Sequence, residues 1–305
     1  MTDRPQLSMT LVNFAAEAPV DWSHLKTIAG AAERAGFDRL VVSDHVAFGE
    51  SLDAYSDPAM GGVAGGRQPT GPDGHWLEPL TTIAHITAVT STIRFGTNIL
   101  LAALRRPVVL AKMAATIDVL SEGRLDLGVG VGWQEAEYLA AGLDFSERGR
   151  LLDHSLAVCR RLWAEQRADF TDDRLDFESI HQMPKPTRPG GVPIWVSGTV
   201  NRASMRRLAE YGRGWIPWGA DAVDPVAGIA KMREAVAAHG RDPSDIEVVG
   251  ALPSKSGADG ELERLWRGGV TDFRARMRLD PVDPHLEERM AEFVADFCRA
   301  TASFG

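Results

Sequence analysis

The sequence predicts an α/β fold, a (β/α)8 TIM barrel in which eight parallel strands alternate with helices. Strand-like and helix-like segments alternate along all 305 residues, and parallel strands with short connections require such helical crossovers. Eight strand–helix units also fit a chain of this length. An open, doubly wound sheet is the alternative, but the pattern shows no break or reversal. We therefore expect one barrel domain over residues 1–305.

The predicted strands are short, apolar and rich in β-branched residues. They cover residues 7–13, 38–43, 93–100, 125–129, 193–197, 214–217, 246–252 and 270–276. The fourth strand continues into Gly128, Gly130 and Gly132, which face one side of the chain. Glycine weakens a strand interior, so this row indicates a strand end that a flat ligand or another backbone approaches closely. The spacing does not fit the dinucleotide fingerprint, whose third glycine would fall at Trp133.

The predicted helices follow the strands in turn. They cover residues 22–35, 80–89, 108–120, 133–140 with 148–165, 202–211, 225–239, 260–266 and 285–301. Asp21 is a candidate N-cap, Gly36 lies just past a helix end, and Pro107 opens the third helix. A long loop rich in glycine and proline, residues 48–77, follows the second strand, and loops of this length are typical of lids and binding loops. A small polar hairpin is expected over residues 169–180, before the fifth strand.

The composition is that of a soluble globular enzyme, with 44% hydrophobic and 25% charged residues. The net charge of −9 argues against a broad nucleic-acid surface. The chain does not open with a signal peptide and has no apolar run of membrane-spanning length, so we expect a cytoplasmic protein. Cys159 and Cys298 are predicted to be buried, reduced thiols. No nucleophile elbow or Walker loop occurs, so covalent hydrolysis is not supported.

The candidate chemistry lies where strands end, because ligands of such barrels bind at the carboxyl ends of the strands. The second strand ends in Asp44 and His45, and histidine is suited to proton transfer near neutral pH. A histidine bonded to the backbone is the structural alternative. Zinc is a further alternative, but no second cluster with ligand spacing lies at another strand end, so we expect no metal.

Two further groups of residues lie near predicted strand ends. Ser197, Gly198 and Thr199 precede a helix, whose free amides and dipole favour a phosphate, although simple capping of the helix explains them equally well. Large aromatic side chains near the ends suggest walls for a planar apolar ligand. These pocket candidates are His75, Trp76, Trp133, Trp215 and Trp218. Arg105 and Arg106, by contrast, are expected to be solvated.

A series of short stretches carries a specific resemblance. They are residues 42–45 (VSDH), 78–84 (EPLTTIA), 93–100 (IRFGTNIL), 106–112 (RPVVLAK), 123–135 (GRLDLGVGVGWQE), 147–150 (ERGR), 162–163 (LW), 184–186 (PKP), 193–198 (PIWVSG) and 212–215 (GRGW). In this order the chain resembles the luciferase-like monooxygenase superfamily, in its branch of coenzyme F420-dependent oxidoreductases. The resemblance covers about residues 7–218, and the C-terminal quarter matches only loosely.

The resemblance implies a luciferase-like barrel that holds a flavin or 5-deazaflavin ring at its mouth, beside Asp44 and His45. It implies that His45 acts as base or stabiliser in hydride transfer, and that helices after the second and third strands pair two copies into a homodimer. It also implies a cis peptide between Asn98 and Ile99. The residues implied to contact the cofactor are Asp44, Thr97, Asn98, Ile99, Gly130, Val131 and Gly132 along the ring, with Ser197, Gly198 and Thr199 at its phosphate.

One departure bears on the substrate. Sugar-phosphate dehydrogenases of this branch carry a proton-donating glutamate where this chain has Trp133, so a small, more apolar substrate is expected. The predicted function is hydride transfer between coenzyme F420 and such a substrate. An FMN-dependent monooxygenase fed by a separate reductase is the alternative, and a barrel that binds the ring without turnover, as carrier or sensor, is a lesser one.

Overall fold

In the computed structural model, which describes residues 4–62, 64–253, 260–277 and 279–304, eight parallel strands close into a barrel. The strands are β1 (Gln6–Thr10), β3 (Arg39–Val42), β5 (Arg94–Thr97), β6 (Leu125–Val129), β9 (Ile194–Gly198), β10 (Gly212–Pro217), β11 (Glu247–Ala251) and β12 (Asp272–Ala275). Each pairs with the next along the chain, and β12 pairs with β1. The predicted barrel is therefore confirmed, and the open sheet is excluded.

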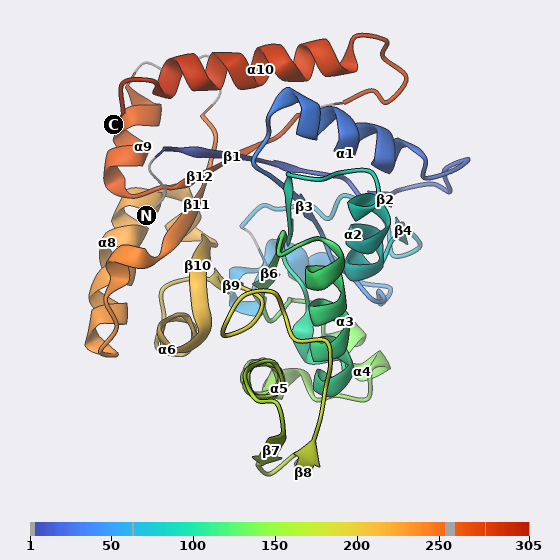
Figure 1. The fold of residues 1–305 in the computed structure, drawn as a ribbon, viewed down its shortest axis with the longest axis vertical. Helices are drawn as coiled ribbons and strands as arrows, with labels where there is room; N and C mark the ends of the chain where they lie inside the picture. Colours follow the sequence, from blue (N-terminus) through green and yellow to red (C-terminus); the bar gives the residue numbers. More distant parts are fainter. Residues whose placement is uncertain (1–3, 63, 254–259, 278, 305) are drawn as a thin grey trace.

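Helices cover the outside of the barrel. They are α1 (His24–Ala35), α2 (Pro79–Thr87), α3 (Pro107–Leu120), α4 (Glu135–Ala140), α5 (Arg148–Ala164), α6 (Arg202–Tyr211), α7 (Ala220–Val223), α8 (Pro225–Ala238), α9 (Glu261–Gly268) and α10 (Leu286–Thr301). Figure 1 shows α10 lying beside α1, so the last helix completes the ring next to the first. Among the described residues, no helix is both long and apolar enough to cross a bilayer.

Two smaller sheets interrupt the regular pattern. The expected hairpin is present as β7 (Ala168–Thr171) and β8 (Asp176–Ile180), which are antiparallel and lie beyond α5, at the edge of the molecule away from α10 (Figure 1). The long loop after β3 contains the 3-10 turns η1 (Asp53–Ser56) and η2 (Pro58–Met60) and the short strand β4 (His75–Trp76). Strand β4 pairs with β2 (Phe14–Ala15), which anchors the end of this loop beside the barrel mouth.

Some local predictions are wrong. Asp21 does not cap α1, because the helix begins at His24, and the Asp21 carboxylate instead accepts hydrogen bonds from the amide and hydroxyl of Ser23. Cys298 is exposed rather than buried, since it lies on the outer side of α10. The glycine after α1 is confirmed as a C-cap, with Gly36 in the left-handed region at φ 95°.

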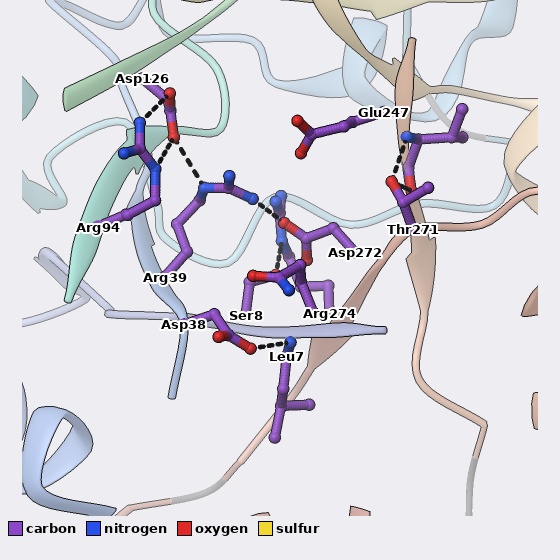
Figure 2. A network of polar contacts seen from close by, with 12 residues as sticks. Leu7, Ser8, Asp38, Arg39, Arg94, Asp126, Glu247, Thr271, Asp272 and Arg274 are labelled. Atoms are coloured by element: carbon purple, nitrogen blue, oxygen red, sulfur yellow. Dashed lines mark hydrogen bonds and ion pairs between the residues drawn. The ribbon is translucent and has the colours of Figure 1, made fainter. Parts of the chain in front are cut away.

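The barrel interior is layered. Its lower part, where the strands begin, is filled by charged side chains, and Figure 2 shows how they meet. The Arg39 guanidinium donates to Asp126 at 3.0 Å and to Asp272, while Arg94 donates to Asp126 at 2.6 Å. Above this layer lies a small apolar cluster of Trp195, Ile216 and Val249 with Ile99 packed on it. The charged layer therefore fills the end of the barrel where the strands begin. A ligand site is expected at the opposite end, where the strands finish.

Candidate functional site

His45 lies just beyond the end of β3, at the barrel mouth, inside a group of aromatic rings. Its imidazole is 4.4 Å from the ring centre of Phe48, 4.9 Å from that of Trp76 and 5.7 Å from that of Trp133. The last two contacts are edge-on, a geometry that aromatic rings prefer. The His45 side chain is only 10% exposed, so these rings enclose most of the imidazole.

Glu137, on α4, is the acid that faces His45, and sequence reasoning missed it. Its Oε2 lies 3.3 Å from Nδ1 of His45, and its Oε1 accepts the amides of Val46 at 2.5 Å and Ala47 at 3.3 Å. The side chain is only 1% exposed. Glu137 and His45 are 92 residues apart in the sequence. No local motif distinguishes a buried glutamate in a short helix, so the only signal in the sequence is that Glu137 lies five residues after Gly132.

Asp44 bonds to groups other than its neighbour His45, and its predicted place beside the cofactor ring stays a prediction. Its Oδ2 accepts the amide of Leu101 at 2.8 Å and a guanidinium hydrogen bond from Arg105 at 2.6 Å, and Oδ1 accepts a second one at 3.0 Å. Arg105 also donates to Glu78 at 2.8 Å and is largely buried, so the expectation that it is solvated is wrong. Although burial opposes its charge, the carboxylates of Asp44 and Glu78 raise the pKa of Arg105.

The alternating glycines make room for a neighbouring segment of the same chain. A Cβ at Gly128 would lie 2.0 Å from the carbonyl oxygen of Thr97, and one at Gly130 would lie 2.6 Å from the side chain of Ile99. A Cβ at Gly132 would lie 2.7 Å from Leu101. Close approach of another backbone therefore accounts for Gly128, whereas Gly130 and Gly132 make room for the side chains of Ile99 and Leu101. The peptide between Asn98 and Ile99 within this segment is cis, as the resemblance implies.

The segment before α6 is organised by capping. Asn201 accepts the amides of Ala203 and Ser204, both at 3.0 Å, and completes a capping box with the Ser204 hydroxyl. That hydroxyl also donates to the carbonyl of Thr199, which is itself exposed. Ser197 and Gly198 end β9 at the barrel mouth and are half-buried. The capping alternative explains the start of the helix, and phosphate binding by residues 197–199 stays a prediction.

Two tryptophans near the barrel mouth, Trp133 and Trp218, contact the long loop that follows β3. Tyr55 of the loop packs edge-on against Trp133, with ring centres 5.3 Å apart. Trp218, after β10, donates its indole N–H to the carbonyls of Gly61 at 3.0 Å and Gly62 at 3.3 Å. The loop is thus attached to two sides of the mouth. Trp133 and Trp218 both contact this loop, and their predicted role as walls of a ligand pocket stays a prediction.

The other three predicted pocket residues, Trp76, His75 and Trp215, differ in their position relative to His45. Trp76 lies beside His45 and stacks on Phe14, with ring centres 4.1 Å apart, whereas the neighbouring His75 is exposed. Trp215 is fully buried, and its indole lies against α8, so that a Cβ at Gly228 would be 3.2 Å from it. The prediction that Trp215 lines the pocket is therefore wrong, because alternate residues of β10 point outward, and Ile216 is the one that faces the barrel interior.

No cluster of three or more metal-ligating side chains occurs within the part of the chain that the structure describes. The chemical groups at the mouth are an imidazole backed by a buried carboxylate and the apolar aromatic rings around it. Such a set can bind a planar ring and hold or move a proton beside it.

Comparisons with known proteins identify related bacterial sequences. The uncharacterized protein Rv0940c of Mycobacterium tuberculosis is 28% identical over 90% of this chain and 93% of its own length. The F420-dependent hydroxymycolic acid dehydrogenase of the same organism is 29% identical over 78% of this chain and 61% of its own length. The pyrimidine monooxygenase RutA of Allorhizobium ampelinum is 31% identical over 56% of this chain and 49% of its own.

Solved structures show the same fold. An F420-dependent secondary alcohol dehydrogenase, in complex with an F420–acetone adduct, superposes with a TM-score of 0.69 at 16% identity, covering 97% of this chain and 99% of that one. The long-chain alkane monooxygenase LadA superposes with a TM-score of 0.73 at 15% identity, covering 98% and 92%. The luciferase-like monooxygenase family model matches residues 7–264. The chain therefore belongs to the luciferase-like monooxygenase family, whose members are oxidoreductases and monooxygenases.

Proposed function

We propose that this protein is a coenzyme F420-dependent oxidoreductase that moves a hydride between the deazaflavin and a small, apolar organic substrate. The observation that carries the proposal is His45, an imidazole held at the barrel mouth by Glu137 and surrounded by aromatic rings. A relative that spans 78% of this chain is an F420-dependent dehydrogenase, which supports the choice of cofactor.

The residues at the mouth fit a planar redox ring. The fit rests on the His45 side chain, which is 10% exposed and lies between apolar rings, and on residues 130–132, which follow the end of β6. In this proposal Ile99 and residues 130–132 contact the ring, and residues 197–199 contact its phosphate. A deazaflavin supplies a carbon centre that accepts or releases a hydride. The protein orients the ring and the substrate, and the loop attached through Trp218 excludes water from them.

In this proposal His45 accepts or donates the proton that is transferred together with the hydride. Among the described residues its Nε2 has no hydrogen-bond partner, so this nitrogen is free to exchange a proton with a substrate hydroxyl or carbonyl oxygen. Trp133 and Trp76 beside it present apolar surface, which favours a substrate without phosphate or carboxylate groups.

The cofactor assignment is tested by titrating the purified protein with F420 and with FMN while following ring absorbance and protein fluorescence. We expect micromolar or tighter binding of F420. Replacing His45 with alanine should slow turnover by about 10²–10⁴-fold and leave F420 affinity within a few fold. Tight binding of FMN with none of F420 would refute the F420 proposal.

An FMN-dependent monooxygenase is the second candidate, and the relative that supports it is the pyrimidine monooxygenase RutA. A two-component enzyme of this kind consumes oxygen when reduced FMN is supplied by a separate reductase. Oxygen uptake with reduced FMN and a substrate, without turnover of F420, would favour this candidate over the first.

A further inference from the structure

Glu137 is a buried acid that contacts His45, and its effect on the protonation of the imidazole follows from its other contacts. It lies on α4, and both of its carboxylate oxygens are used. Oε1 accepts the amides of Val46 and Ala47, and Oε2 lies 3.3 Å from Nδ1 of His45. Two consecutive amides and the imidazole thus all face one carboxylate. The Glu137 carboxylate therefore fixes both the backbone at Val46 and Ala47 and the orientation of the His45 ring.

The contacts determine where the imidazole proton lies. Backbone amides only donate, and a carboxylate only accepts. The Glu137 carboxylate facing Nδ1 therefore accepts a hydrogen bond from an Nδ1–H group, and the neutral imidazole carries its lone pair on Nε2. Phe48, Trp76 and Trp133 pack around the ring, so the imidazole cannot rotate by half a turn to exchange its nitrogens without displacing them.

We propose that Glu137 is a positioning residue that fixes His45 in the Nδ1–H tautomer and presents the Nε2 lone pair at the barrel mouth. This inference rests on the proposed function. In the direction of substrate oxidation, Nε2 would take up the proton of a substrate hydroxyl as the hydride leaves the adjacent carbon for the deazaflavin. Atoms balance in that step. The O–H and C–H bonds break, the carbonyl double bond forms, the proton goes to Nε2 and the hydride goes to the cofactor.

The Glu137→Gln substitution separates positioning from folding. The glutamine carbonyl can still accept the Val46 and Ala47 amides, but its NH2 group faces Nδ1 and can only donate. The neutral imidazole must then accept at Nδ1 and carry its proton on Nε2. Glu135→Gln is the matched control, because Glu135 lies on the same helix but is exposed.

Long-range 15N–1H spectra of histidine-labelled protein report the tautomer directly, with the His45 signals assigned by their loss in His45→Asn. At a pH of about 8, where an ordinary histidine is neutral, we expect the Nδ1–H pattern in the wild type and in Glu135→Gln, and the Nε2–H pattern in Glu137→Gln. An Nε2–H pattern in the wild type would overturn the proposal, and so would an unchanged pattern in a folded Glu137→Gln protein.

Kinetics provide the second measurement. Glu137→Gln should lower kcat about 10²-fold, with F420 affinity changed less than threefold, whereas Glu135→Gln should leave both unchanged. A kcat equal to that of the wild type would overturn the proposal. The spectra need no cofactor, so the expected tautomers in a protein that does not turn over F420 would refute the proposed function and leave the tautomer assignment in place.

Discussion

Arg105 shows how one side chain connects segments that are distant in sequence. Its guanidinium joins Asp44, at the end of β3, to Glu78, just before α2. The Asp44 carboxylate is fully buried, whereas the Glu78 side chain is 36% exposed. A buried ion pair that loses one partner leaves a charge without compensation, but an exposed pair contributes little. The two contacts of Arg105 therefore differ greatly in their importance for stability.

Replacing Arg105 with methionine should lower the free energy of unfolding by about 3–5 kcal/mol, because the Asp44 carboxylate keeps only the Leu101 amide. Glu78→Gln should cost less than about 1 kcal/mol. The double variant Arg105→Met/Asp44→Asn should recover part of the larger loss, since it removes the unpaired charge. Urea unfolding followed by circular dichroism measures all three. Equal losses for Arg105→Met and Glu78→Gln would contradict this account.

Among single residues of the site, some can be predicted from the sequence and others cannot. His45 is recognisable because it lies three residues after the end of β3, on the side of the barrel where ligands of parallel barrels bind. Its partner Glu137 and the Asp44 partner Arg105 are 92 and 61 residues away from the residues they contact. No spacing rule reaches across such distances, and a charged side chain in sequence is read as exposed unless its partner is known. The contacts of Glu137 with His45 and of Arg105 with Asp44 therefore follow from the three-dimensional fold and not from the sequence pattern.

At the scale of elements, boundaries set by local chemistry were predicted best. Helix α6 covers the predicted residues 202–211, with Asn201 as its cap, and α3 begins at Pro107. Strand ends were predicted less well. The first strand stops at Thr10 rather than at residue 13, because the side chain of Asn13 bonds to the backbone of Ser43 and Leu77 where a ladder would continue. A strand ends where its neighbours stop pairing, which one segment alone does not encode.

Glu33, near the end of α1, ties that helix to the turn before β5. Its carboxylate accepts the amides of Ser91 at 2.8 Å, Thr92 at 2.7 Å and Ile93 at 3.0 Å. Burial opposes the charge, but these hydrogen bonds prevail and lower the pKa of Glu33 to about 2 from the ordinary 4.5. Because the folded value is depressed, the stabilisation is complete above pH 4.5 and is lost as the pH falls towards 2.

Glu33→Gln mimics the protonated acid, so it should lower the free energy of unfolding at pH 7 by about 1–2 kcal/mol, allowing for the partial exposure of the group. The difference from the wild type should shrink steadily below pH 4.5. Glu17→Gln is the control, since Glu17 is exposed and makes no hydrogen bond in the described structure. Urea unfolding at a series of pH values measures the difference, and a gap that does not depend on pH would refute the linkage.

At the scale of the whole molecule, the barrel separates stability from chemistry. The charged layer of Figure 2 lies where the strands begin, with Arg39 and Asp272 as the first residues of β3 and β12. His45 lies at the other end, beyond the last residue of β3. The apolar cluster around Trp195 lies between them, with the Arg39 guanidinium 4.6 Å from the centre of its ring. Side chains of a parallel barrel are arranged in such layers, with ligands bound at one face only.

Arg39→Met should therefore destabilise the fold without altering the barrel mouth. Asp272 is completely buried and pairs with Arg39, so the substitution should cost about 3–5 kcal/mol in urea unfolding. Arg39→Met/Asp272→Asn should recover part of that loss, because it removes the buried Asp272 charge, although the buried guanidinium of Arg274 then loses the carboxylate that supports its charge. F420 affinity, measured on folded protein at low temperature, should stay within about twofold of the wild type in both variants, since the substituted layer and His45 lie at opposite ends of the strands. A loss of affinity that the second substitution does not reverse would show that the two ends are coupled.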